Sequence, residues 1–144
     1  MTVLISNENI NLKNKINLIL DSFVNHFDVS RGIFLKPNIV FPVKDRSGEI
    51  TRLAVVKTLI KCLRERFPNI DIVIGEGVAA GCNPEKNFQV SGYEKLAREL
   101  NVPLLDLNKA PRKKLQWEFG PLTLPSDALE RFYINLPILK HSSA

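Results

Sequence analysis

The chain has 144 residues, of which 44% are hydrophobic and 24% are charged, and its formal net charge is +5. This length and composition predict one globular domain that needs no disulfide scaffold, and two cysteines are too few to ligate an iron–sulfur cluster by themselves. The apolar runs are too short for a membrane-spanning helix and no secretory signal opens the sequence, so we expect a cytoplasmic protein without a membrane partner.

The first half of the chain alternates short apolar runs with longer segments of helical periodicity, a pattern typical of α/β domains with parallel sheets. The expected elements are a strand at 3–5, a helix over 12–27, a strand at 32–35, a helix from Thr51 to Pro68 and a strand at 70–74. Asn7 or Asn9 would cap the first helix and Thr51 the second. The buried face of the second helix would contain Ala54, Val55, Leu59, Leu63 and Phe67.

The second half continues the alternation and adds one irregular segment. The expected elements are a short helix opened by Asn83 or Pro84, a helix over 93–100, a strand at 102–107, a hairpin or edge excursion at 113–124, one helical turn from 126 and a strand at 132–136. The chain is therefore predicted to be a Rossmann-like, three-layer α/β domain with a mostly parallel sheet and a small antiparallel excursion near 113–124.

Unusual polar residues follow four of the predicted strands. They are found in the segments Lys36-Pro37-Asn38, Gly75-Glu76-Gly77, Asp106-Leu107-Asn108 and Asn135-Leu136-Pro137, the last followed by Lys140 and His141. Open parallel sheets bind ligands outside the carboxyl ends of their strands. Because parallel strands would bring all four segments to one rim, the sequence predicts a binding site there.

The basic and amide residues of this rim suit an anionic ligand. Lys36 would supply a point charge to an anion, and Asn38 and Asn135 would orient the ligand, with Lys140 beyond them. The structural alternatives stay open, since Lys36 would also suit a solvated strand end and Asn38 a turn cap.

The acidic residues and glycines suggest chemistry at the same rim. Glu76 and Asp106 would bind a metal ion or transfer protons, although Glu76 would equally serve as the cap of a neighbouring loop. Gly75 and Gly77 would let the backbone approach a ligand. The glycine spacing matches neither a dinucleotide fingerprint nor a P-loop, so the cofactor stays unidentified.

Outside the rim, two features have weaker functional interpretations. Cys82 lies in a predicted loop without an adjacent basic residue, whereas Cys62 is expected to be packed in a helix. The basic run from Lys109 to Lys114 would suit contacts with nucleic-acid phosphates, with Trp117 as a stacking ring, but a solvated loop is the favoured interpretation because no nucleic-acid-binding motif accompanies it.

Five segments in order resemble the family known as domain of unknown function 362. The matching segments are Lys36-Pro37-Asn38, Thr51-Arg52 with 56–63, Ile72 to Gly77, Ser91-Gly92-Tyr93 with Leu105-Asp106-Leu107, and Ile134 to Lys140. The resemblance implies an α/β core, a bacterial or archaeal origin and redox work, since many relatives carry ferredoxin-like cysteine motifs in an appended region. Those cysteines are absent here, so no cluster is expected in this chain alone. Lys140-His141 replaces the usual K-x-H, and relatives continue beyond this point. We therefore expect one domain over 1–144 that is a truncated family member.

Two functional hypotheses follow. The first is a small-anion or cofactor-binding domain within a redox-linked enzyme, with Glu76 and Asp106 as its catalytic residues. The second is a non-catalytic interaction or oligomerisation module that pairs with a second copy or a partner domain.

Overall fold

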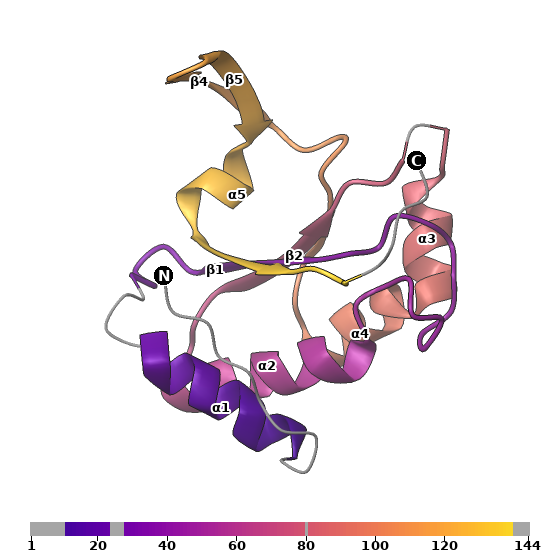
Figure 1. Ribbon diagram of the computed structural model, residues 1–144, viewed down its shortest axis with the longest axis vertical. Helices are drawn as coiled ribbons and strands as arrows, with labels where there is room; N and C mark the ends of the chain where they lie inside the picture. Colours follow the sequence, from indigo (N-terminus) through magenta and orange to yellow (C-terminus); the bar gives the residue numbers. More distant parts are fainter. Residues whose placement is uncertain (1–10, 24–27, 80, 140–144) are drawn as a thin grey trace.

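The computed structural model describes residues 11–23, 28–79 and 81–139, and its centre is a parallel sheet (Figure 1). Four strands lie in the order β3-β2-β1-β6 and all pair in parallel. Their bounds are Ile33–Pro37 for β1, Ile72–Glu76 for β2, Leu104–Asp106 for β3 and Phe132–Leu136 for β6. The predicted strand at 3–5, the predicted caps Asn7 and Asn9, and Lys140 lie outside the described residues.

Helices on the two sides of this sheet complete a three-layer arrangement, which confirms the predicted fold class (Figure 1). Their bounds are Leu12–Phe23 for α1, Leu53–Arg66 for α2, Pro84–Ser91 for α3, Tyr93–Leu100 for α4 and Ser126–Glu130 for α5. The larger core lies between the sheet and α1, α2 and α4, whereas Phe34, Val73 and Leu107 form a smaller core on the side of α5. None of the described helices has the length and apolar character that crossing a bilayer demands.

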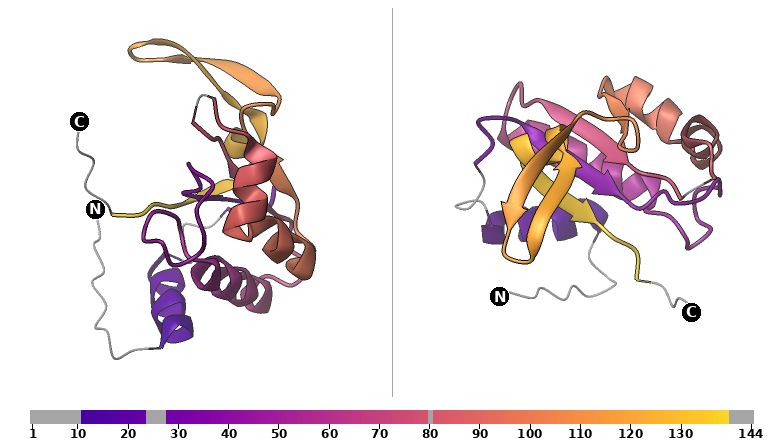
Figure 2. Two further views of the ribbon diagram at one scale, coloured as in Figure 1. Left: turned by 90° about the vertical axis from the view of Figure 1, so that its right-hand side faces the viewer. Right: turned by 90° about the horizontal axis from the view of Figure 1, so that it is seen from above.

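The antiparallel excursion predicted near 113–124 is a two-stranded hairpin. It consists of β4 (Arg112–Trp117) and β5 (Gly120–Pro125), and Figure 2 shows it projecting away from the rest of the molecule. Every residue of β4 is exposed, and near the tip the Trp117 ring meets Phe119 edge-on at a centroid distance of 4.8 Å. The hairpin therefore adds no layer to either core.

The helix α2 begins differently from its prediction. Thr51 does not cap it: the helix begins at Leu53, after Arg52, and the Leu53 N–H donates to Asp45 Oδ1 at 3.1 Å. The reason is that the Thr51 hydroxyl is held elsewhere, against the ends of β1 and β6. By contrast, the Asn83 side chain caps α3 as predicted, accepting from the Lys86 N–H.

The buried face of α2 is also shifted from its predicted position. Leu59 and Leu63 are buried as predicted, but Ala54 is exposed and Val55 is only partly buried. The helix instead meets the sheet through a stripe at i, i+3, i+4 and i+7, formed by Val56, Leu59, Ile60 and Leu63. The predicted stripe is wrong at Ala54, because a residue two positions before Val56 points to nearly the opposite side of an α-helix.

Candidate functional site

The carboxyl ends of the four strands form one rim, as the sequence predicts. In the register of the sheet, Lys36 on β1 lies opposite Asn135 on β6, and Glu76 on β2 lies opposite Asp106 on β3. Residues paired in a parallel ladder point to the same face of the sheet. The rim therefore brings together the ends of strands that are up to about 100 residues apart in the chain.

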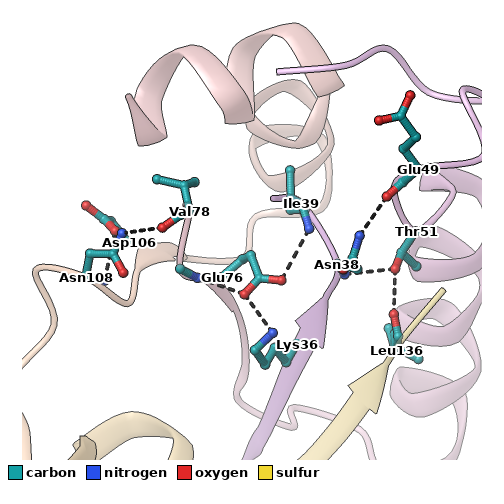
Figure 3. A network of polar contacts seen from close by, with 11 residues as sticks. Lys36, Asn38, Ile39, Glu49, Thr51, Glu76, Val78, Asp106, Asn108 and Leu136 are labelled. Atoms are coloured by element: carbon teal, nitrogen blue, oxygen red, sulfur yellow. Dashed lines mark hydrogen bonds and ion pairs between the residues drawn. The ribbon is translucent and has the colours of Figure 1, made fainter. Parts of the chain in front are cut away.

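An ion pair joins the central two strands at this rim (Figure 3). Lys36 Nζ lies 2.7 Å from Glu76 Oε1, and the side chains are 32% and 4% exposed respectively. The same Glu76 oxygen accepts from the Gly77 N–H at 2.8 Å, and Oε2 accepts from the Ile39 N–H at 3.2 Å. Both carboxylate oxygens thus hold loop backbone, which favours the loop-cap interpretation of Glu76. Its catalytic assignment stays a prediction.

A second group of hydrogen bonds joins Thr51 to the ends of β1 and β6 (Figure 3). Thr51 Oγ1 accepts from the Asn38 N–H at 2.9 Å and donates to the carbonyl of Leu136 at 2.5 Å. The Asn38 side-chain amide donates to the carbonyl of Glu49 at 2.7 Å. Asn38 therefore supports the loop between β1 and α2, as its turn-cap interpretation requires. Its ligand role stays a prediction, and Thr51 is a rim residue that sequence reasoning took for a helix cap.

Asp106, the second predicted catalytic carboxylate, ends β3. Its Oδ1 accepts from the Asn108 N–H at 3.0 Å, while Oδ2 is buried, has no hydrogen-bond partner among the described residues and lies 3.9 Å from Lys109 Nζ. The Asn108 side chain in turn donates to the carbonyl of Val78 at 3.0 Å. Asp106 thus has one oxygen committed to a turn and one without a hydrogen bond.

Gly75 and Gly77 are close to other side chains of the protein. A Cβ atom on Gly75 would lie 2.5 Å from Cζ of the Phe34 ring, and one on Gly77 would lie 2.8 Å from Asn108 Oδ1. Any larger residue would force these neighbours to move. Internal packing against the buried Phe34 ring therefore explains Gly75, whereas the Asn108 side chain beside Gly77 can move, and the approach of either glycine to a ligand stays a prediction.

A small cavity opens beside Lys36 on the α5 side of the sheet. It has a volume of about 350 Å³ and is lined almost wholly by apolar atoms of Lys36, Leu107, Leu124, Pro125, Ala128, Leu129 and Tyr133. The Tyr133 ring stacks on Phe34 at a centroid distance of 5.8 Å. Burial, with a smaller effect of the Glu76 charge, raises the pKa of the Tyr133 hydroxyl above its usual value, so this group is a hydrogen-bond donor at neutral pH. Sequence reasoning missed Tyr133, because a tyrosine in a strand carries no signal that it borders a cavity.

The other candidate residues, Asn135, Cys62 and Cys82, do not line this cavity. The Asn135 side chain is exposed, and the described residues offer it no hydrogen bond. Cys62 is buried, which raises the pKa of its thiol, and Cys82 is partly exposed. Within the ranges 11–23, 28–79 and 81–139, no group of three or more His, Cys, Asp and Glu side chains is arranged to hold a metal ion.

Tyr93 links α4 to the rim, and its hydroxyl makes the stability of the protein depend on pH. Its hydroxyl is fully buried and donates to the carbonyl of Thr51 at 2.7 Å. Burial, and then the charges of Asp45 and Glu76, raise its pKa far above the usual value near 10. The folded protein therefore keeps this proton at a pH where the unfolded chain loses it.

We expect this group to make the protein less stable in alkali. The contribution of the Tyr93 hydroxyl to the free energy of unfolding is complete below about pH 10. It decreases as the pH rises further, by up to about 1.4 kcal/mol per pH unit. Urea unfolding between pH 8 and 11 measures the effect. The Tyr93→Phe variant should start from a lower stability, because the Thr51 carbonyl loses its donor, but should decline less steeply. Equal slopes for the two proteins would contradict the expectation.

Comparison with known proteins identifies one family. A model described as "Domain of unknown function (DUF362)" matches residues 33–144, a range that begins at β1 and includes the whole four-stranded sheet. No curated protein and no solved structure matches the chain.

Proposed function

The chain belongs to the DUF362 family, whose function is unknown, and we propose that its rim binds a small anionic molecule at Lys36. The observation that carries the proposal is that the Lys36 side chain lines the cavity while its ammonium group pairs with Glu76 at the rim. An ammonium has three N–H donors, and that of Lys36 forms an ion pair with Glu76 at 2.7 Å. The Lys36 side chain is 32% exposed, so part of it is open to a ligand.

Neighbouring groups support the same assignment. Glu76 holds Lys36 in place, because its own carboxylate is fixed by the backbone N–H groups of Ile39 and Gly77. The Tyr133 hydroxyl adds a neutral donor near the cavity, and Asn135 lies opposite Lys36 in the sheet. Since the Lys36–Glu76 pair is neutral overall, binding would depend on hydrogen bonds more than on long-range attraction. A weak dependence on salt is therefore expected.

Titration of the protein with acetate and with inorganic phosphate tests the proposal, followed by amide NMR shifts. The largest shifts should fall on the amides of Lys36, Gly77 and Tyr133. If the largest shifts instead fell on Lys113 and Lys114 in the hairpin, the proposal would be contradicted.

Replacing the Lys36 ammonium group should weaken the binding of the anion. Lys36→Met should weaken the affinity about tenfold or more, because a hydrogen bond to a charged group contributes about 1.5–3 kcal/mol. The matched control is Lys61→Met, on the exposed side of α2, which should leave the affinity unchanged. Equal affinities for the two variants would overturn the assignment of Lys36.

The family resemblance further supports a redox-linked enzyme that acts on the bound anion. In it, Glu76 and Asp106 would transfer protons to or from the bound molecule. The cytoplasmic location likewise stays a prediction from the sequence.

A specific surface favours the second hypothesis, self-association. An apolar groove of about 480 Å³ lies between α1, α2 and β6, the edge strand of the sheet that the described residues form, with Ile19, Phe23 and Val55 among its lining residues. We propose that a second copy of the chain is its occupant, since an edge strand with an apolar groove beside it offers both backbone pairing and burial.

Ile19→Lys should shift such a dimer toward monomer in sedimentation velocity, because it places a charge in the groove. Ile19 is 45% exposed, so the fold should tolerate the change. The control is Leu18→Lys, which replaces an equally exposed neighbour that does not line the groove. A wild-type chain that is monomeric at all concentrations would exclude this function.

A further inference from the structure

Resting on the proposed anion site, we infer that its ligand is a monocarboxylate with a small flat apolar body, of the aromatic-acid class. The carboxylate would meet Lys36, and the body would lie in the cavity between α5 and the sheet. The inference depends on the size of the cavity, the chemistry of its walls and the number of its hydrogen-bond donors.

The size of the cavity limits the ligand. Binding pockets for small molecules usually measure roughly 300–1,000 Å³, and this cavity of about 350 Å³ lies at the lower end of that range. A dinucleotide or another multi-ring cofactor would not fit within it, whereas a single ring with a short polar group would.

The walls favour an apolar body. Leu107 and Ala128 belong to the core on the α5 side of the sheet, and Leu124 and Leu129 extend this apolar lining. Tyr133 contributes an aromatic ring, and flat rings pack well on such a surface. Lys36 is the one charged residue in the lining, so a ligand with a second charge would bury that charge without a partner.

The donors distinguish a carboxylate from a phosphate. A carboxylate has two oxygens and one negative charge, and the residues that line the cavity include Lys36 and Tyr133, which carry an ammonium and a hydroxyl donor. A phosphate has three free oxygens and nearly two charges, and it would lie close to the Glu76 carboxylate that binds the same lysine. Charge and donor number therefore both match the carboxylate better.

Four probes test this inference by calorimetry and by NMR shifts of the intact chain: benzoate, acetate, benzyl alcohol and inorganic phosphate. Benzoate should bind about tenfold or more tightly than each of the others, because it combines the anion with the buried ring. Its shifts should include the Ala128 and Leu129 methyl groups.

The other outcomes separate this inference from the anion site itself. Acetate or phosphate binding at Lys36 as tightly as benzoate would overturn the aromatic-acid class and leave the anion site standing. Benzyl alcohol binding as tightly as benzoate would overturn both, since the anion would contribute nothing. Absence of binding by all four would also overturn both.

Filling the cavity provides an independent check. Ala128→Phe should abolish benzoate binding and leave acetate binding unchanged, and Ala54→Phe on the exposed side of α2 is the matched control. If Ala128→Phe does not fold, Leu129→Ala replaces it and should weaken benzoate severalfold with no effect on acetate. Loss of acetate and benzoate binding in equal measure would show that the ring does not occupy this cavity.

Discussion

Glu76→Ala is expected to lower the free energy of unfolding by about 3 kcal/mol. The change leaves the buried Ile39 N–H and the partly buried Gly77 N–H without their acceptor, and a buried unsatisfied group costs about 1–3 kcal/mol. Lys36 also loses its counter-ion, but it is 32% exposed and water will replace part of that interaction. Urea unfolding of the variant beside the wild type measures the difference.

The control for this prediction is Glu118→Ala, which removes an exposed carboxylate between the strands of the hairpin. It should change the stability by no more than about 0.5 kcal/mol. If Glu76→Ala were as stable as that control, Glu76 would not be the acceptor that holds the two loops together, and the position of Lys36 would need another explanation.

Thr51→Val is expected to cost about 2–3 kcal/mol, although it removes only one hydroxyl and keeps the shape of the side chain. The hydroxyl accepts from the Asn38 N–H and donates to the Leu136 carbonyl, and valine leaves both groups unsatisfied next to a buried position. Equilibrium unfolding in urea is again the measurement, and hydrogen exchange at the Asn38 amide should accelerate.

Thr51→Ser is the matched control, because it keeps the hydroxyl and loses a methyl group. It should cost about 1 kcal/mol, the usual value of a buried methyl or methylene group. Equal losses for the serine and valine variants would mean that packing, and not the link between β1 and β6, explains the position of Thr51.

The Lys36–Glu76 ion pair affects the position of loops more than the net stability of the fold. Desolvation of a buried pair offsets much of its attraction, so the pair itself is weak evidence of a stable fold. The Glu76 carboxylate instead fixes positions, because it joins the β1–α2 loop at Ile39, the residue Gly77 directly after β2, and Lys36 on the cavity side of the sheet. A loss of stability in Glu76 variants would therefore accompany a loss of order at the proposed anion site.

Elements with local signals could be predicted closely from the sequence. The bounds of α4 (Tyr93–Leu100) and β6 (Phe132–Leu136) match their predictions. For α4 the physical reason is local, since Gly92 and Asn101 at its two ends both adopt the left-handed backbone conformation that these residue types tolerate. The start of α2 was missed because its cap, Asp45, lies eight residues before Leu53 in a loop whose path no local pattern specifies.

For the candidate site, the sequence by itself determined which polar residues end the strands, because proline, glycine and charged residues mark where a buried strand stops. Only the tertiary structure decided what those residues touch. Glu76 bonds to Ile39, 37 positions away, and Thr51 bonds to Leu136, 85 positions away. Contacts of this kind depend on the order of the strands and the path of the loops, and hydrophobic periodicity records neither. The cavity beside Tyr133 follows the same rule, since it exists only where β1, β6, α5 and the base of the hairpin meet.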